Sequence, residues 1–412
     1  MIKLKKTAKN IFVLFSGDIT SRIIGFVAAA YLARTLGVSN FGIVGIGSAY
    51  LTYALTVSSN GLPILGVRKI IESSEEKSVS NLVSARLVFS FIVIFLTIII
   101  SFFIQSSPTR AIILAYSLYL IPAAFLLDWY FQAKEKMGVL VSGRVLGALV
   151  YLILVLILVR REGDVLKVAQ SWFWGGVVTA IFFVLLYFRE GIRLKIHISF
   201  SKIKSLFLEA YTLGVANIIS ELTIAFPPIF LGLVMTSKDV GYYSAGARLV
   251  ALFLILDRVF CISFFPAITR CVKETPHMLN QIFNQTLKWI VVIAILVGFL
   301  GILLAEPLII FIFGSEYQVS IQVFQMLMSY FILTLINSVL TFTLIALNEE
   351  RTYTISLVVG AAFLLFSSYF FVKIFGSAGM GLGLGVFQIT GLFIMINKLK
   401  KFLKVELWRT II

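Results

Sequence analysis

The chain has 412 residues, of which 60% are apolar and only 13% are charged, and its formal net charge is +16. Soluble globular domains carry about 25% charged residues, so this composition excludes a soluble fold and predicts an all-α protein with many membrane-spanning helices. Two cysteines and two isolated histidines offer neither a disulfide framework nor a histidine metal site, and the basic residues flank apolar runs rather than forming a nucleic-acid surface.

The predicted elements are transmembrane helices, each needing about 20 apolar residues to cross a bilayer core about 30 Å thick. Asp18 and Arg22 interrupt the first apolar run, which we therefore interpret as a span and not as a cleaved signal peptide. Pro227-Pro228 predicts a break in the seventh span. In chain order we predict about twelve spans, at 10–33, 41–62, 81–104, 110–132, 138–159, 168–188, 206–233, 239–264, 282–304, 318–346, 352–372 and 378–397.

The basic residues between the spans predict the orientation. An even number of spans places both termini on one side, where the segments hold 22 Lys and Arg residues against seven on the other side. The positive-inside rule therefore predicts that both termini are cytoplasmic. The predicted domains are a six-helix lobe at 1–188, a basic cytoplasmic linker at 189–205, a second six-helix lobe at 206–397 and a basic cytoplasmic tail at 398–412.

The two halves share a weak internal repeat. Residues 40–44 (NFGIV) open the second predicted span, and residues 239–243 (DVGYY) open the eighth, at an offset of 199 residues. Six spans in each half predict a parallel repeat related by an axis along the membrane normal. Halves of this kind commonly enclose a substrate site and alternate its access between the two faces.

Ionisable residues inside predicted spans are the candidate functional residues. A charge at mid-bilayer costs at least about 2.5 kcal/mol, so such residues usually face a bundle interior or a wet cavity. Asp18 and Arg22 are one helical turn apart, so a static ion pair is the main alternative for them. Asp128 and Arg144 lie near span ends and are interpreted as interfacial. The residues expected to line a cavity are Asp18, Arg22, Glu221 and Arg248, with Arg86, Asp257 and Arg258 as further candidates.

Several apparent motifs favour ordinary structural roles. The alternating glycines of 379–385 lie in the twelfth span without a preceding strand, and they indicate close helix packing instead of a phosphate loop. Trp172 and Trp174 are typical of an interfacial aromatic belt. The chain has no Walker A sequence and no Ser/His/Asp or Cys/His arrangement. We therefore predict a protein that is not an enzyme and needs neither a cofactor nor a metal.

Four segments, in the same order and at similar spacing, resemble motifs of polysaccharide repeat-unit flippases. Those flippases are the Wzx type of the multidrug/oligosaccharidyl-lipid/polysaccharide exporter superfamily. Val38 stands where the family usually has proline, and Ala133 where glycine is common. The matching segments are 31–42 (YLARTLGVSNFG), 61–69 (GLPILGVRK), 128–137 (DWYFQAKEKM) and 375–381 (FGSAGMG).

The resemblance implies a V-shaped bundle of two six-helix lobes in the inner (cytoplasmic) membrane. It implies an undecaprenyl-pyrophosphate-linked oligosaccharide as substrate, moved from the cytoplasmic to the outer leaflet for O-antigen- or capsule-type surface polysaccharide. The expected partners are this lipid-linked oligosaccharide, membrane lipids, a proton or sodium ion for coupling and the polysaccharide polymerase machinery, and no nucleic acid. The resemblance itself transfers no residue roles.

A binding hypothesis follows from the charges. Arginine makes bidentate contacts with phosphate oxygens, so four of the intramembrane arginines are predicted to neutralise the diphosphate. The carboxylates are predicted to hold these arginines before substrate binds, or to couple transport to protons or sodium. The predicted substrate-binding cations are Arg22, Arg248, Arg86 and Arg258, and the predicted charge partners are Asp18, Glu221 and Asp257.

Three alternatives stay open. A drug or metabolite antiporter of the same superfamily would have a cavity with net negative charge. A peptidoglycan-precursor flippase usually has fourteen spans, which is more than this chain provides. A membrane-embedded glycosyl- or acyltransferase would need an acid/base constellation in a loop, and the sequence offers none.

Overall fold

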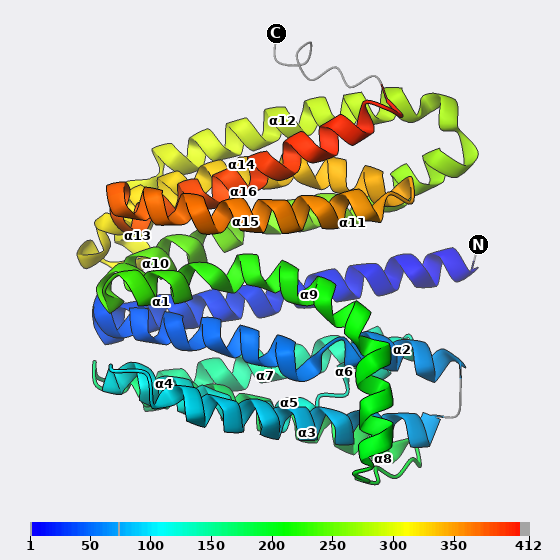
Figure 1. Cartoon of the computed structure of the whole chain (residues 1–412), viewed down its shortest axis with the longest axis vertical. Coiled ribbons are helices and arrows are strands. Elements are labelled where there is room, and N and C mark those ends of the chain that lie inside the picture. Colours follow the sequence, from blue (N-terminus) through cyan, green and yellow to red (C-terminus); the bar gives the residue numbers. More distant parts are fainter. Residues whose placement is uncertain (1, 73–74, 404–412) are drawn as a thin grey trace. The chain divides into compact units, whose positions relative to one another are not determined.

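The computed structural model (Figure 1) describes residues 2–72 and 75–403, except for the side chains of 2–12, 75–77, 212–218, 220, 222 and 223. Within these residues the regular structure is helical. Unit by unit along the chain, the α-helices are α1 (Ile2–Ser59), α2 (Leu62–Glu72), α3 (Glu75–Ser101), α4 (Ser107–Ser117), α5 (Leu120–Ala124), α6 (Asp128–Ala133), α7 (Met137–Leu158), α8 (Val165–Arg189), α9 (Phe200–Val234), α10 (Ser237–Phe253), α11 (Ile255–Glu274), α12 (Leu279–Leu303), α13 (Ala305–Phe313), α14 (Val319–Ala346), α15 (Glu350–Phe375) and α16 (Gly379–Leu399). Short 3₁₀ helices lie at Pro276–Met278, Ser315–Tyr317 and Gly376–Ala378.

The helices confirm a polytopic all-α membrane fold. In the described part of the chain, nine segments are long and apolar enough to cross a membrane. This number is lower than twelve because one segment contains both halves of α1 and another contains both α15 and α16. In addition, the side chains of α9 are only partly described. Each of the twelve predicted spans falls on a helix or on a run of consecutive helices, although the helices extend up to ten residues beyond the predicted bounds, as α11 does at its end. Residues 404–412 of the predicted tail lie outside the described residues.

Gly37 divides α1 into two spans. Its backbone lies at φ 72° and ψ 170°, a conformation that L side chains rarely adopt, so the helix is interrupted there. The two sides of this kink correspond to the predicted spans 10–33 and 41–62. The predicted break at Pro227-Pro228 is wrong, because α9 continues through both prolines.

The fourth predicted span is not one continuous helix but the series α4, α5 and α6. Pro122 lies within this series and has no backbone N–H to donate, which weakens helical hydrogen bonding. In a membrane, backbone groups freed in this way must find other partners. On α3, Ser90 Oγ donates to the Leu120 carbonyl oxygen at 3.0 Å. Arg86 of the same helix binds two further carbonyl oxygens of this series, as described below.

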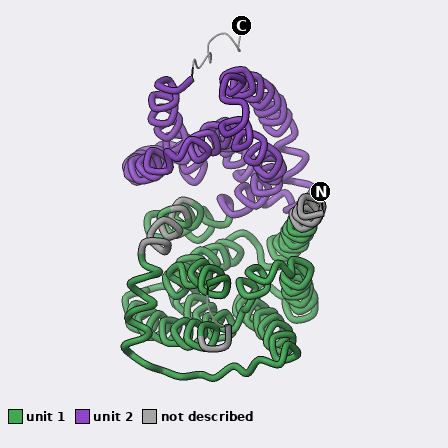
Figure 2. Tube along the Cα trace, turned by 90° about the vertical axis from the view of Figure 1, so that its right-hand side faces the viewer, with its two compact units in different colours: residues 1–241 green, residues 242–412 purple. Residues whose placement is uncertain are grey.

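Contacts divide the chain into two compact units, residues 1–241 and 242–412 (Figure 2). In the first unit α1 packs against α7 and α9, and α7 packs against α8. In the second unit α16 packs against α14 and α15, and α14 against α11 and α12. Helix α9, predicted to open the second lobe, contacts α1, α2 and α3 of the first unit. The assignment of spans to two six-helix lobes stays a prediction.

Residues 192–199, within the predicted linker, run without helix along α3. The backbone N–H of Lys195 donates to Ser80 Oγ, and that of His197 donates to Ser84 Oγ, each at 3.1 Å. The two serines are four residues apart on a helix, which corresponds to a rise of about 6 Å. The two donors are two residues apart in extended chain, which corresponds to about 6.6 Å, so donors and acceptors have nearly the same spacing. This part of the linker is therefore fixed to the first unit.

Glu190 joins the same surface to the short connection between α6 and α7. Its carboxylate accepts hydrogen bonds from the Tyr130 hydroxyl at 2.8 Å and from Lys136 Nζ at 2.7 Å. Burial opposes ionisation of Glu190, but these two donors outweigh it and lower the pKa of the carboxyl. The motif at 128–137 thus anchors the end of α8.

Gly42 and Gly241, which occupy matching positions in the sequence repeat, lie in close contact. A Cβ added to Gly42 would lie 1.8 Å from the Ser237 carbonyl oxygen, and one added to Gly241 would lie 2.1 Å from the Val38 carbonyl oxygen. Val38 and Ser237 are 199 residues apart, as are Gly42 and Gly241. The contact is therefore reciprocal in the way that a two-fold relation between repeats requires, and it supports the internal repeat.

Candidate functional site

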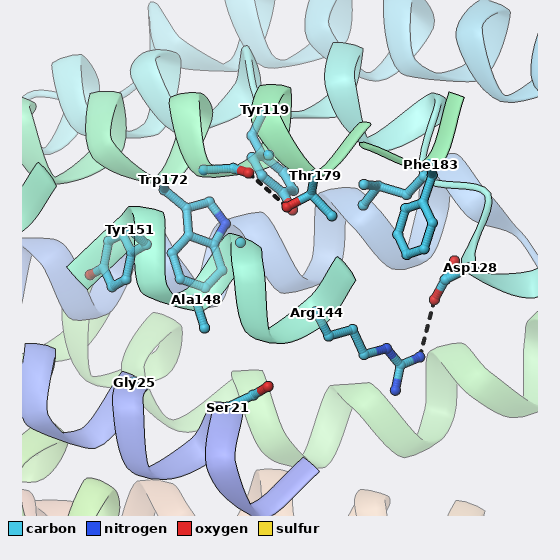
Figure 3. Close-up of a pocket in the computed structure, with 14 residues that line it drawn as sticks. Ser21, Gly25, Tyr119, Asp128, Arg144, Ala148, Tyr151, Trp172, Thr179 and Phe183 are labelled. Carbon is cyan, nitrogen blue, oxygen red and sulfur yellow. Dashed lines mark hydrogen bonds and ion pairs between the residues drawn. The ribbon is translucent and has the colours of Figure 1, made fainter. Parts of the chain in front are cut away.

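A cavity of about 320 Å³ lies inside the first unit (Figure 3). Its walls come from α1, α7 and α8 and from the broken series α4 to α6. Cavities from about 300 Å³ upward are typical of small-molecule sites. The residues that line it are Ser21, Gly25, Tyr119, Leu126, Asp128, Arg144, Gly147, Ala148, Tyr151, Trp172, Gly175, Gly176, Thr179 and Phe183.

Small residues create the space. Gly147 of α7 and Gly175 of α8 allow these helices to approach, since a Cβ on Gly175 would lie 3.1 Å from the Gly147 carbonyl oxygen. Gly25 of α1 has the opposite property, because a Cβ added there would meet no atom within 4 Å. A side chain at position 25 would therefore enter open space beside the cavity.

An aromatic wall forms one side of the cavity. The Tyr151 and Trp172 rings meet edge to face, with centroids 4.6 Å apart, and the Tyr119 ring lies 6.0 Å from that of Trp172. Trp172 Nε1 and Ser21 Oγ are buried and have no hydrogen-bond partner among the described residues. Trp172 lines the cavity, whereas Trp174 is exposed, and the interfacial aromatic belt stays a prediction.

An ion pair lies at one end of the cavity. Arg144 Nη2 of α7 donates to Asp128 Oδ2 at the start of α6, at a distance of 3.0 Å (Figure 3). The side chains are 50% and 31% exposed, respectively, so the pair is accessible. Accessible pairs contribute only about 0–1 kcal/mol to stability, so the fold itself gains little from this one. One guanidinium with further donors facing a cavity is suited to an anion or to sugar hydroxyls.

The predicted residues Asp18 and Arg22 are not among the residues that line this cavity, but they lie on α1 within one helical turn of two that do. They form an ion pair on α1, with Arg22 Nε 2.9 Å from Asp18 Oδ2. Residues three or four apart share a helix face, so this pair shares its face with the cavity residues Ser21 and Gly25. The side chains are 39% exposed for Arg22 and 26% for Asp18. The ion pair between Asp18 and Arg22, predicted as the main alternative to a role in lining the cavity, is therefore present, and both of its side chains are partly exposed.

Arg86 is placed differently, since its side chain is only 9% exposed. Its Nη1 donates to the Leu126 carbonyl oxygen at 2.9 Å, and its Nη2 donates to the Ala123 carbonyl oxygen at 2.7 Å. Arg86 thus pairs the Leu126 carbonyl oxygen at the break between α5 and α6, and it adds a second donor to the Ala123 carbonyl oxygen, which also accepts from the Leu126 backbone N–H. It is not among the residues that line the cavity.

We predict that Arg86→Met lowers stability by about 1–3 kcal/mol, because the Leu126 carbonyl oxygen would be left unpaired, whereas the Ala123 carbonyl oxygen keeps its hydrogen bond from the Leu126 backbone N–H. Thermal unfolding of the purified variant in detergent measures this loss. Arg68→Met is the matched control, since Arg68 is 71% exposed and pairs with an exposed Glu72. An Arg86→Met protein with normal melting but lost transport would instead support the predicted role of Arg86 in substrate binding.

The remaining predicted residues lie elsewhere. Glu221 is half-buried in α9. In the second unit Arg248 of α10 and Arg258 of α11 are exposed, and Ser338 Oγ donates to Asp257 Oδ1 at 2.6 Å. The structure thus brings Asp18 and Arg22 together beside the first cavity and places Asp257 in a second polar cavity. A single cavity shared by residues of both units stays a prediction.

Sequence reasoning missed the Asp128–Arg144 pair, although a signal was present. The two residues lie eight positions before and after Lys136, which belongs to the short connection between their helices. Two helices joined by a short turn run antiparallel, so residues equally distant from the turn reach the same depth. Opposite charges placed symmetrically about a turn therefore predict an ion pair.

Three comparisons relate the chain to known proteins. The model of the family described as "Polysaccharide biosynthesis protein" matches residues 7–272. A relative from Escherichia coli (strain K12) named "Putative O-antigen transporter" is 23% identical over 244 residues, which cover 58% of this chain and 59% of the relative. A relative of the same name from Shigella flexneri is 23% identical over 334 residues, covering 77% of this chain and 78% of the relative.

Solved structures share the fold. An inward-facing multidrug resistance MATE family transporter of the MOP superfamily has a TM-score of 0.74 at 15% identity, covering 95% of this chain and 98% of that one. The lipid II flippase MurJ in an inward closed conformation has a TM-score of 0.72 at 16% identity, covering 94% and 87%. A MOP superfamily transporter from Pyrococcus furiosus has a TM-score of 0.61 at 15% identity, covering 96% of each chain. At these identities the likeness shows the fold.

Proposed function

Because the chain belongs to the polysaccharide biosynthesis protein family, whose model matches residues 7–272, we propose that it is a flippase for lipid-linked oligosaccharides. Its proposed substrate is an undecaprenyl-pyrophosphate-linked repeat unit, moved from the cytoplasmic to the outer leaflet of the inner membrane. The product is used to build an O-antigen- or capsule-type surface polysaccharide. The names of the curated relatives and the family membership support this proposal.

The observation that carries the proposal is the chemistry of the first-unit cavity. Its aromatic wall offers flat apolar faces to the C–H faces of sugar rings. Arg144, the orphaned Trp172 Nε1 and the orphaned Ser21 Oγ offer polar partners to hydroxyl groups. Its volume of about 320 Å³ suits one or two sugar rings rather than a whole repeat unit. We propose that this cavity holds the part of the oligosaccharide next to the lipid.

The need for such a protein follows from the cost of crossing hydrocarbon. Sugar hydroxyls and a pyrophosphate lose their water in the bilayer core without replacement. In the proposed mechanism the arginines, Arg22 and Arg248 first among them, replace part of that hydration at the diphosphate, while the lipid tail stays in the bilayer. Alternating access between the two faces, expected of parallel repeats, completes the transfer.

A drug or metabolite antiporter is the second candidate, favoured by the aromatic wall. Aromatic faces attract organic cations, and the fold is that of a multidrug resistance transporter. Against it, two accessible arginines, Arg144 and Arg22, lie in or beside the cavity. Each is paired with a single aspartate, so the charged residues there give no excess of negative charge to attract a cation.

Analysis of a deletion strain tests the function. Surface polysaccharide and lipid-linked repeat units, separated by gel and identified by mass spectrometry, should show lost polymer and repeat units trapped on the cytoplasmic side. Plasmids carrying the wild-type chain should restore the polymer, and Arg22→Ala and Arg248→Ala chains should not, although both proteins remain in the membrane. Unchanged polymer with altered sensitivity to cationic drugs would instead establish the antiporter.

One control variant and one blocking variant make this test specific. Arg68→Ala removes an exposed cation that lies outside the cavity, so it should restore the polymer fully. Gly25→Phe directs a bulky side chain into the space beside the cavity, where a Cβ would meet no atom within 4 Å, and it should reduce export. Normal polymer in both the Arg22→Ala and the Arg248→Ala strains would contradict the proposed role of these cations.

A further inference from the structure

The chain that joins α8 to the later part of α9 forms a surface of its own. It comprises residues 192–199, which run without helix along α3, and the first turns of α9, up to residue 211. In Figure 1 these turns of α9 lie across the direction of α3 and α7, and the helix then bends to run along them. We name residues 192–211 the crossing segment.

The inner side of the crossing segment is fixed to the first unit. Ile203, Leu206 and Ala210 are spaced by three and four residues, so they share one face of α9. All three are buried in a core to which α2, α3, α6 and α8 also contribute. In the extended part, Ile192 and Leu194 pack against the same core. The segment is therefore held in place on the first unit and cannot move as a free connection.

The outer side of the crossing segment exposes large apolar side chains. Phe200 is 83% exposed, Ile198 68% and Leu208 63%. Ile196 and Ile198 project to the same side of the extended chain, and Phe200 and Leu208 share a face of α9. Apolar side chains exposed in this way are unfavourable in water, and a group of them marks contact with a membrane or with another protein.

The crossing segment also carries an excess of positive charge. Glu209 is its one acidic residue, and Glu209 Oε2 lies 2.7 Å from Lys69 Nζ of α2, so this carboxylate is already neutralised from outside the segment. Four cations are exposed and form no ion pair with a described side chain, namely Arg193, Lys195, Lys202 and Lys204. The outer surface therefore favours a partner with negative charge.

Contacts with α3 place the crossing segment at the edge of the membrane-facing surface. The Phe207 ring of α9 lies 5.6 Å from the Phe89 ring of α3. Two residues further along α3, at Phe91, a series of exposed apolar side chains begins, in which Phe91 is 56% and Phe95 63% exposed. Side chains of this kind on a spanning helix face hydrocarbon. The crossing segment thus borders the part of the first unit that faces lipid.

We propose that the crossing segment is a docking surface for anionic phospholipid. Its apolar side chains enter the boundary between headgroups and acyl chains, and its four exposed cations bind lipid phosphates. Amphipathic elements with these two properties lie in the interface of a bilayer, and basic side chains close to that surface attract anionic headgroups. The continuity with the exposed side of α3 favours lipid over a protein partner. The inference does not rest on the proposed function, because it concerns contact with lipid and not transport.

Quenching of a fluorophore on the crossing segment tests the docking. A full-length Cys261→Ser/Cys271→Ser chain, which lacks native cysteines, receives Ser201→Cys at an exposed position and a nitrobenzoxadiazole label there. The purified chain is reconstituted into phosphatidylcholine vesicles that contain a minor fraction of phosphatidylglycerol. A nitroxide on the phosphatidylglycerol acyl chain, close to the headgroup, should quench several-fold more strongly than the same nitroxide on phosphatidylcholine at equal mole fraction.

Three other outcomes would overturn the proposal. Equal quenching by the two lipids would show that the surface lies in the membrane without preferring anionic lipid. The absence of quenching by either lipid would show that it faces water or a protein. A preference that disappears when sodium phosphate replaces sodium chloride at constant ionic strength would assign the cations to free phosphate.

Charge variants of the labelled chain test the part of the cations. Arg193→Gln/Lys195→Gln should lower the preference for phosphatidylglycerol at least several-fold, because each basic side chain near an anionic surface contributes about a fivefold preference. This variant should still fold, since both side chains are exposed and Lys195 binds Ser80 through its backbone N–H. Arg160→Gln/Arg161→Gln is the matched control, because it removes two adjacent exposed cations from the connection between α7 and α8, and it should keep the full preference. An unchanged preference in the Arg193→Gln/Lys195→Gln chain would contradict the proposed lipid contact.

Discussion

Replacing Arg144 with alanine should lower polysaccharide export by about ten- to a hundredfold while the protein stays folded in the membrane. A hydrogen bond to a charged group contributes about 1.5–3 kcal/mol, and each 1.4 kcal/mol corresponds to a factor of ten. The Asp128–Arg144 pair is accessible, so its loss should cost the fold only about 0–1 kcal/mol. The variant also leaves Asp128 as an unpaired negative charge beside the cavity, which repels an anionic head group.

Complementation of the deletion strain measures this effect, with polymer quantified against the amount of protein in the membrane. Arg144→Lys should retain part of the activity, because an ammonium keeps the charge and loses the planar fork. Lys167→Ala is the matched control, since Lys167 also pairs with one aspartate, Asp164, at 2.7 Å but outside the cavity. Full export by the Arg144→Ala chain would remove Arg144 from the proposed binding site.

Replacing Gly42 with alanine should destabilise the protein by about 3 kcal/mol, the upper end of the usual cost of overpacking. The added Cβ would lie 1.8 Å from the Ser237 carbonyl oxygen and 2.7 Å from the Gly241 backbone nitrogen. Both neighbours are backbone atoms, so no flexible side chain can move away. Helix α1 and the start of α10 must therefore separate.

Thermal unfolding of the purified chain, followed by size exclusion after heating, measures this loss. Gly241→Ala should behave similarly, because its Cβ would lie 2.1 Å from the Val38 carbonyl oxygen in the reciprocal contact. Gly138→Ala is the control, because a Cβ there meets no atom within 4 Å, and its melting temperature should be unchanged or slightly higher. A Gly42→Ala chain that melts like the Gly138→Ala chain would show that the two backbones are not in close contact.

The positions of the spans could be predicted because the bilayer imposes them residue by residue. Each crossing needs about 20 consecutive apolar residues, and that requirement depends on local sequence alone. Hence the predicted spans at 138–159 and 318–346 agree with α7 and α14 to within one residue at each end. The family was also accessible from sequence, because the motifs at 31–42 and 128–137 are contiguous; the match of the family model confirms the resemblance.

The break in the fourth span could not be located in the same way. Pro122 signals a weakened helix, but the span is continuous by hydropathy. At the break Arg86, on another helix, binds the Leu126 carbonyl oxygen, and Ser90 of the same helix donates to the Leu120 carbonyl oxygen in α5. From hydropathy alone, Arg86 is a charge that is costly within the membrane and is therefore predicted to have a function. In the structure it donates hydrogen bonds to backbone carbonyl oxygens of the neighbouring helical series.

The sequence by itself determined that this protein crosses the membrane many times, and it identified the family and the small set of charges within the spans. Only the tertiary structure decided which of those charges meet each other. It paired Arg144 with Asp128 and bound Asp257 to Ser338, 81 residues further along the chain. It also placed Trp172 among the residues that line a cavity. The physical reason is that insertion into a bilayer depends on local hydrophobicity, whereas a binding site depends on which helix faces pack together, and close packing between distant segments decides that.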